Sequence, residues 1–374
     1  MAKLFEQFPS ITKADWLSKV EKDLKGRPLD SLNWAITENI VMTPFAHAED
    51  LEKSPAPLIN KRATNSWEIG VRIVVKDMQL ANKEALNALM NGANALAFEL
   101  TNSLNKSDLS ILLKGIELEW ISTHFIFKES AWKPFLNLFI EYLDEQKCNK
   151  EKLACTFSFG SSITSSQGAT YFTKVVRQLP QVQLLTIDTK ALNQGTDTVI
   201  QELTETIIQG NQALINLNKQ NLELAQYHTQ IQFSLSLRDS YFVNIAKIRA
   251  LKLLWQQVLS AWQIESSTCN IEVHLTTTTQ TDNENYNKIK ATAQAMAAVI
   301  GGAKRLYIYP SDEFKDGIGS PFAQRIALNI QHLMQLESYM DRVVDPAAGS
   351  YYIEKLTNQL AEEAWRVFVV TGNW

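Results

Sequence analysis

The histidines are the first candidates for chemistry in this chain, because an imidazole can ligate a metal or transfer a proton near neutral pH. None stands in an HExxH motif, and no two have the spacing of a metal-ligand pair, so we expect no metal site. His124 and His274 fall on predicted strands, where each would contact a ligand or belong to a hydrogen-bonded core. The five histidines are His47, His124, His228, His274 and His332.

Small and hydroxyl-bearing side chains alternate with apolar ones along several predicted strands. Alternate residues of a strand share a face, so one face is polar and the other apolar. In a barrel this pattern predicts a wide, wettable interior in place of the usual layers of branched side chains. A parity error of one residue would exchange the two faces. The candidate lining residues are Thr156, Ser158, Ser234, Ser236, His274, Thr276 and Thr278.

Charged residues follow several strands, at the end where barrel enzymes carry their catalytic groups. Spacing alone assigns them no role, although Lys190 leaves open a Schiff-base lysine of the aldolase type. These residues are Lys128, Lys190, Arg238, Asp239 and Asp312.

Two glycine-containing segments are candidates for phosphate binding. Gly301 and Gly302 follow a predicted helix and precede a strand, the reverse of the order in a dinucleotide-binding loop, so we interpret them as a helix C-cap. The segment GSSITSSQG from Gly160 follows a strand and opens a helix. Its amides could hold an anion, but a solvated loop is the commoner outcome.

The elements that would position these side chains are about eight short strands separated by helix-forming stretches. This alternation predicts a closed (β/α)8 barrel, with an open doubly wound sheet as the competing architecture. The strand runs are EIGVRIVV from Glu68, ALAFEL from Ala95, STHFIFK from Ser122, ACTFSFG from Ala154, VQLLTID from Val182, IQFSLSL from Ile231, IEVHLTT from Ile271 and RLYIYP from Arg305.

An N-terminal arm, residues 1–64, precedes the barrel, residues 65–374. Thr12 and Asp15 form a predicted capping box for a helix that Gly26 and Pro28 would end. The rest of the arm is irregular. We expect it to pack on a partner subunit or back on the barrel.

Composition excludes several classes of protein. The 374 residues are 45% hydrophobic and 20% charged, with a net charge of -4, which does not suit a nucleic-acid-binding protein. No apolar run reaches transmembrane or signal-peptide length, so we expect a cytoplasmic location. Cys148, Cys155 and Cys269 form no CxxC pair, which indicates reduced thiols.

Several segments resemble the barrel of methylmalonyl-CoA mutase. They are NIAKIRALKLLW at 244–255, ATAQAMAAVIGG at 291–302 and RVVDPAAGSYYIE at 342–354. The arm sequence at 15–34 and NSWEI at 65–69 resemble the small, beta-type subunit in particular.

The resemblance implies a TIM barrel from an isomerase that interconverts methylmalonyl-CoA and succinyl-CoA by an adenosylcobalamin radical mechanism. In that family the pantetheine arm of coenzyme A threads a barrel lined by small hydrophilic residues, which agrees with the polar face described above.

The catalytic motifs of the family are missing at the matching positions. The Thr-Ile-Arg-Gln-Tyr stretch is replaced by EIGVRIVVKD at 68–77, the Tyr-His motif by DTKALNQGT at 188–196, and the Arg-Thr-His-Ser-Gln-Thr-Ser-Gly run by HLTTTTQTD at 274–282. The Asp-x-His-x-x-Gly motif that ligates cobalt does not occur. We therefore expect the cobalamin-binding domain to be absent, by natural loss or because the sequence is a fragment.

The resemblance and the losses together predict a non-catalytic small subunit. It would form a heterodimer with a large catalytic subunit and stabilise it, with adenosylcobalamin bound only at the level of the complex. This chain would supply no catalytic, cofactor-binding or metal-binding residue, and an acyl-CoA is a further candidate ligand. The alternative is an active, divergent acyl-CoA mutase that works with a separate cobalamin-binding protein.

Overall fold

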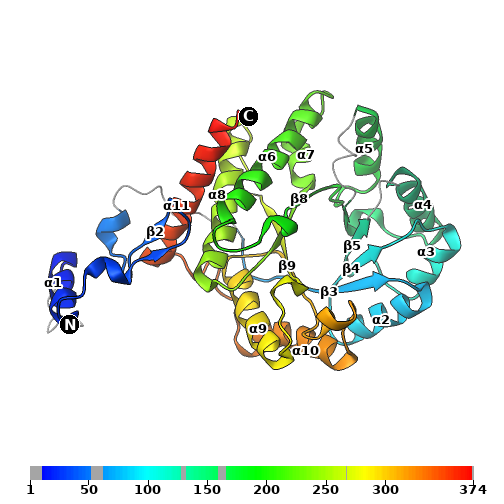
Figure 1. Cartoon of the computed structure of the whole chain (residues 1–374). Helices are drawn as coiled ribbons and strands as arrows, with labels where there is room; N and C mark the ends of the chain where they lie inside the picture. Colours follow the sequence, from blue (N-terminus) through cyan, green and yellow to red (C-terminus); the bar gives the residue numbers. More distant parts are fainter. Residues whose placement is uncertain (1–10, 52–61, 128–131, 159–165, 267, 373–374) are drawn as a thin grey trace, which may run out of the picture.

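Eight parallel strands, each followed by a helix, form the main body of the structure (Figure 1). The computed structural model describes residues 11–51, 62–127, 132–158, 166–266 and 268–372. The strands are β3 (Glu68–Val75), β4 (Ala95–Leu100), β5 (Ser122–Phe127), β6 (Ala154–Ser158), β7 (Leu185–Asp188), β8 (Ile231–Ser236), β9 (Asn270–Leu275) and β10 (Arg305–Ile308). Each lies within one of the predicted runs or within one residue of it, so the eight-stranded α/β barrel is confirmed.

The helices pack around the outside of the sheet. They are α2 (Met78–Met90), α3 (Lys106–Leu112), α4 (Trp132–Glu145), α5 (Ser166–Gln178), α6 (Val199–Asn218), α7 (Leu224–Tyr227), α8 (Tyr241–Ala261), α9 (Glu284–Ile300), α10 (Pro321–His332) and α11 (Tyr351–Val370). Local chemistry fixes their starts. Asp77 accepts a hydrogen bond from the Leu80 N–H at α2, and Ser320 caps α10, where Pro321 needs no donor partner. Among the described residues, no helix is both long and apolar enough to cross a membrane.

The ring of strands closes between β6 and β7. Along the sheet the order is β6-β5-β4-β3-β10-β9-β8-β7, and consecutive neighbours pair in parallel. β6 meets the residues just before β7 through a single bridge between Thr156 and Gln183. Two backbone hydrogen bonds support it, from Phe157 N–H to the Gln183 carbonyl at 2.8 Å and from Gln183 N–H to the Cys155 carbonyl at 2.7 Å. This junction has the fewest ladder bonds of the barrel.

The apolar strand faces point outward, as predicted. Phe98, Phe125 and Phe157 occupy one register layer of β4, β5 and β6, with adjacent ring centroids 5.6 Å apart. Phe135 and Phe139 of α4 close over them. All five side chains are buried. Truncating one buried phenylalanine typically costs about 3–5 kcal/mol, so this cluster is a major part of the core.

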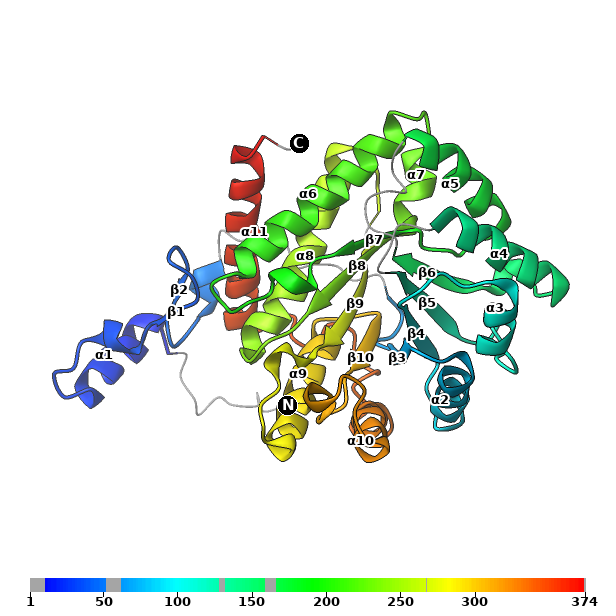
Figure 2. The ribbon, with the colours of Figure 1, turned by 45° about the vertical axis from the view of Figure 1, so that its right-hand side comes forward.

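The arm projects from the barrel beside α11 (Figure 2). Its helix α1 (Lys13–Asp23) starts at the predicted capping box and buries none of its residues. A short hairpin of β1 (Trp34–Ala35) and β2 (Val41–Met42) follows. Asn39 Nδ2 in its turn donates to Glu363 Oε1 of α11 at 2.8 Å, and Asp50 of the 3-10 turn that follows (Ala48–Leu51) lies 3.8 Å from Lys355 Nζ of the same helix, so the arm contacts the barrel at α11.

The segment at 342–354 is tied to α8 by a buried ion pair. Arg249, 1% exposed, donates to Asp345 Oδ2 at 3.1 Å and to Glu354 Oε1 at 2.7 Å. It also donates to Thr357 Oγ1 at 3.2 Å. The Ala348 N–H donates to the Asp345 carbonyl at 2.9 Å, which forms a tight turn. Two of the segments used for the resemblance therefore hold each other in place.

Candidate functional site

The inner face of the barrel carries a connected network of charged and polar side chains, and Glu272 of β9 lies at its centre. One carboxylate oxygen accepts from Ser234 Oγ at 2.9 Å and lies 3.1 Å from His274 Nε2. The other lies 3.3 Å from His124 Nδ1 and 3.4 Å from Arg305 Nη1. Because Glu272 is 0% exposed, these four groups replace its hydration shell.

The charge states in this network follow from burial and from the neighbours. Burial opposes ionisation of Glu272, but His124 and His274 outweigh it and hold its pKa well below the usual 4.5. Burial also lowers the pKa of His274 to about 4, so its imidazole is neutral at pH 7.

Arg305 of β10 joins the amino end of the barrel to this centre. Its Nε donates to Glu68 Oε2, and its Nη1 donates to Thr156 Oγ1 at 3.2 Å. Burial alone would lower the pKa of Arg305, but Tyr307, Glu68 and Glu272 outweigh that effect and raise it. The guanidinium is therefore charged and already paired.

Tyr307 of β10 fills the space above Arg305. Its ring stacks on His274 with the centroids 4.5 Å apart. On the other side lies Gly70 of β3, where an added Cβ would stand 2.5 Å from the tyrosine ring. Gly70 is therefore required for the ring to occupy the barrel interior.

A second cluster of charges lies nearer the carboxyl ends of β3, β4 and β10. Arg72 Nε donates to Glu99 Oε2 at 2.8 Å, and its Nη1 donates to Glu313 Oε1 at 2.7 Å. The guanidinium also lies over the Tyr309 ring, 4.5 Å from its centroid. Burial raises the pKa of Glu313 to about 7, against the opposing effect of Arg72.

Lys190 lies at the same end of the barrel. Its Nζ donates to Asp188 Oδ2 at 2.6 Å and to Ser234 Oγ at 2.9 Å. A Schiff-base lysine needs a neutral amine with room for a carbonyl carbon, whereas this ammonium is held by a carboxylate. The arrangement does not favour the aldolase hypothesis.

Most of the predicted lining residues face this network. Thr156, Ser234, Ser236 and His274 are buried on their strands. Ser158, at the end of β6, lies 2.7 Å from His124 Nε2 through its hydroxyl.

Thr276 and Thr278 depart from the expectation. Because β9 ends at Leu275, both lie beyond the strand, and Thr278 is exposed in a 3-10 turn, Thr277–Thr279. The alternation was extended too far because threonine, with its high strand propensity, continues the pattern of β9 into the turn.

The interior is polar, but it is not the wide, wettable bore expected from the hydroxyls. Between β5, β9 and β10 the described side chains of His124, Glu272, His274, Arg305 and Tyr307 are between 0% and 3% exposed. Large charged and aromatic groups fill the space that small residues on other strands leave.

The remaining predicted positions have ordinary surroundings. Arg238 Nε donates to the Asn193 carbonyl at 2.6 Å, Asp239 pairs with Lys290 at 3.2 Å, and Asp312 accepts from the Ser320 N–H at 3.0 Å. Gly301 is the C-cap of α9, as predicted, and Gly302 follows with φ +81°. Lys128 and the loop from Gly160 to residue 165 lie outside the described residues.

Sequence reasoning missed Glu272, Arg305 and Tyr307. Glu272 lies two residues before His274 and therefore has the same parity, which was the available signal. Arg305 and Tyr307 alternate in the same way on the last strand. The contacts of Arg305 with Thr156 and Glu68 had no signal in the sequence, since these residues lie 149 and 237 positions away from it.

A pocket of about 600 Å³ opens at the amino ends of the strands. Glu68 and Asn270, the first residues of β3 and β9, lie in its wall. Arg62, Lys252 and Lys304 give it a basic lining. Burial lowers the pKa of Lys252 to about 8 and also lowers that of Lys304. An anion bound in this pocket would offset part of the desolvation cost of the charged lysines.

Comparison with known proteins agrees with the resemblance. A sequence model of the methylmalonyl-CoA mutase family matches residues 102–371. The methylmalonyl-CoA mutase small subunit of Porphyromonas gingivalis is 30% identical over 98% of this chain and 64% of its own length. The methylmalonyl-CoA mutase of Rhizobium meliloti is 29% identical over 95% of this chain and 57% of its own length.

The small subunit of Streptomyces virginiae is 24% identical, again over 98% of this chain and 64% of its own length. The chain thus spans less than two thirds of the length of these relatives. The match of the family model over most of the sequence, together with full-chain similarity to small subunits, places the chain in the methylmalonyl-CoA mutase family.

Proposed function

We propose that this chain is the non-catalytic small subunit of an adenosylcobalamin-dependent methylmalonyl-CoA mutase. It would form a heterodimer with a large catalytic subunit and stabilise it, without catalytic or cobalamin-binding residues of its own. The similarity to small subunits supports the assignment. The ion pairs that occupy the arginines of the barrel interior support the loss of catalysis.

The observation that carries this proposal is that both arginines on the inner strand faces are already neutralised. Arg305 pairs with Glu68 and Glu272, and Arg72 pairs with Glu99 and Glu313. Stabilising the carboxylate of an acyl-CoA substrate, or charge that develops on its thioester, needs donors preorganised toward the ligand. Here each guanidinium is directed at a protein carboxylate, so a substrate would have to break a buried ion pair to enter.

The arm supports a role in assembly. Helix α1 buries none of its residues, and the neighbouring hairpin exposes Trp34 and Val41 at 42% and 48%. Within the arm, α1 is held by the Trp16 ring, stacked on Phe45 at 4.2 Å, and by Lys13, which pairs with Asp50, and a helix of 11 residues is by itself marginal in water. Contact with the large subunit would bury these apolar side chains and stabilise the helix.

Co-expression with the large subunit tests the proposal. We expect a stable complex that turns over methylmalonyl-CoA with added adenosylcobalamin, and no turnover by this chain alone. Removing residues 1–33 should weaken the complex while leaving the barrel folded, as judged by circular dichroism. Turnover by the isolated chain with cobalamin, or with a separate cobalamin-binding protein, would favour the active acyl-CoA mutase instead.

The amino-end pocket favours a second role, residual binding of an acyl-CoA. The side chains of Arg62, Lys252 and Lys304 would contact the phosphates of coenzyme A. The Arg305–Glu68 ion pair lies between this pocket and the barrel interior. Equilibrium dialysis with coenzyme A tests this role. Binding that falls at least about tenfold in a Lys252→Gln, Lys304→Gln double variant would support it, in line with losses of about 1 kcal/mol or more for charged contacts. Undetectable binding by the wild-type chain would refute it.

A further inference from the structure

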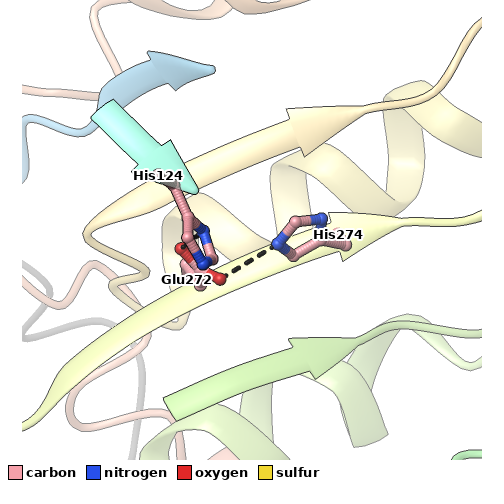
Figure 3. Close-up of side chains that lie close together, drawn as sticks. All are labelled: His124, Glu272 and His274. Atoms are coloured by element: carbon pink, nitrogen blue, oxygen red, sulfur yellow. Dashed lines mark hydrogen bonds and ion pairs between the residues drawn. The ribbon is translucent and has the colours of Figure 1, made fainter. Parts of the chain in front are cut away.

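The side chains of His124, Glu272 and His274 converge inside the barrel (Figure 3). His124 comes from β5, and the other two are alternate residues of β9, so all three point to the same space. We propose that these residues form a structural site for a divalent transition-metal ion, with zinc as the best match. The inference does not depend on the subunit role proposed above.

The separations suit a metal ion with short bonds. Potential ligand atoms of the three residues all lie within 4.8 Å of one another. His274 Nε2 is 3.1 Å from Oε1 of Glu272, and His124 Nδ1 is 3.3 Å from Oε2 of the same carboxylate. Tetrahedral zinc with bonds of about 2.0–2.1 Å holds its ligand atoms roughly 3.4 Å apart. Each imidazole nitrogen thus lies near that separation from one of the two carboxylate oxygens of Glu272, and two imidazoles with one carboxylate are a common zinc ligand set.

The outer partners of these residues are arranged as they are around metal-binding histidines. His124 Nε2 contacts Ser158 Oγ at 2.7 Å, and His274 Nδ1 contacts Tyr309 Oη at 3.1 Å. In each ring the opposite nitrogen faces Glu272. Metal-ligating histidines typically use one ring nitrogen for the ion and the other for a fixing hydrogen bond.

A second, independent observation is the Nδ1 atom of His124. This side chain is 1% exposed, and its Nδ1 makes no hydrogen bond, although it lies 3.3 Å from the carboxylate. Leaving a buried polar atom without a hydrogen bond costs about 1–3 kcal/mol. A metal ion bonded to this lone pair would compensate that cost.

Binding of the metal ion requires no net release of protons from the protein. If His274 carries its proton on Nε2 before the ion binds, that proton moves to Nδ1, which then donates to Tyr309 Oη. The Glu272 carboxylate, which contacts both histidines in the metal-free protein, then coordinates the ion. Arg305 keeps Glu68 and Thr156 as partners, so it is not left unpaired.

The ion would join opposite walls of the barrel. In the sheet order, β4, β3 and β10 separate β5 from β9. Three protein ligands buried from solvent give a structural role, because little room remains for a substrate at the fourth position. The fourth ligand would be a water molecule.

Titration of the purified full-length chain with Co²⁺ and Zn²⁺ tests the site. The protein is unfolded in chelator and refolded with each metal, since a buried site exchanges slowly when folded. We expect about one ion per chain after desalting, with the visible absorption of tetrahedral Co²⁺. His124→Gln should abolish both signals, and His274→Gln should do the same. His228→Gln, at a buried histidine outside the group, is the matched control and should keep them.

The outcomes separate the site from adventitious binding. Metal content that persists in both ligand variants, or no metal in the refolded wild-type protein, would overturn the proposal in favour of a plain hydrogen-bond network. Circular dichroism of each variant shows whether it folds. Should either ligand variant not fold, the absorption spectrum of the wild-type Co²⁺ protein still decides, because an octahedral or absent spectrum contradicts a His2Glu tetrahedral site.

Discussion

Replacing Arg305 with methionine tests whether the charged interior is held together as described. The guanidinium is 3% exposed and contacts Glu68, Glu272 and Thr156. Methionine fills a similar volume without the charge and leaves Glu272, 0% exposed, without its cation. Removing one partner of a buried ion pair costs about 3–5 kcal/mol. Because Glu272 keeps two imidazoles and Glu68 is partly exposed, we expect a loss near 3 kcal/mol.

A double-mutant cycle isolates the electrostatic part of that loss. In Arg305→Met with Glu272→Gln, the buried Glu272 carboxylate is removed together with its cation, and only the partly exposed Glu68 loses its partner. We expect the double variant to be more stable than the sum of the single losses implies, by about 1–3 kcal/mol, the usual coupling between contacting groups.

Urea unfolding at pH 7, followed by circular dichroism and by tryptophan fluorescence, supplies the free energies. The control is Arg366→Met, which breaks a surface pair with Glu363 and should cost less than about 1 kcal/mol. Equal losses for Arg305→Met and Arg366→Met, or additive single losses in the cycle, would show that the interior network does not hold the barrel together.

Three further predictions follow from the interior and the core. Gly70→Ala should destabilise the chain by about 1–3 kcal/mol in the same unfolding assay, because its Cβ would lie 2.5 Å from the Tyr307 ring and 2.7 Å from the Leu306 carbonyl oxygen. A companion Tyr307→Leu change should recover only part of the loss, since the backbone contact remains, and unchanged stability of Gly70→Ala would contradict the clash. Burial raises the pKa of Glu313 to about 7, so the folded chain binds more protons than the unfolded chain between pH 4.5 and 7. The free energy of unfolding should therefore fall as the pH rises through this window, by up to about 3 kcal/mol. Glu313→Gln should flatten that slope, and an unchanged slope would assign it to other groups. Burial raises the pKa of the Cys155 thiol to about 11. Iodoacetamide at pH 7.5 should therefore alkylate Cys155 only after denaturant is added, as measured by peptide mass spectrometry. Rapid labelling of the native protein would place the thiol at the surface.

The fold could be predicted from the sequence to a large extent because its signals are local. The strands alternate apolar and polar residues, and Thr12 with Asp15 marks the first helix start directly. Each of these signals depends on residues within one element, so no knowledge of tertiary contacts was needed.

The chemistry of the interior could not be predicted in the same way. His124 and Glu272 are 148 residues apart in the sequence, and they meet only because the sheet brings β5 opposite β9. The hydroxyl face of β6 and β8 was recognised, but the volume left by its small residues is taken by Arg305 and Tyr307. Filling of a barrel depends on side chains from all its strands at once, and alternation along one strand carries no information about it.

Cobalamin stoichiometry and turnover of the purified subunit pair test the central claim most directly. The pair is reconstituted with excess adenosylcobalamin, freed of unbound cofactor, and assayed with methylmalonyl-CoA beside this chain alone. We expect one cobalamin per heterodimer in an active pair, and neither bound cofactor nor turnover in the isolated chain. Two cobalamins per heterodimer, or isomerisation of methylmalonyl-CoA by this chain without its partner, would contradict it.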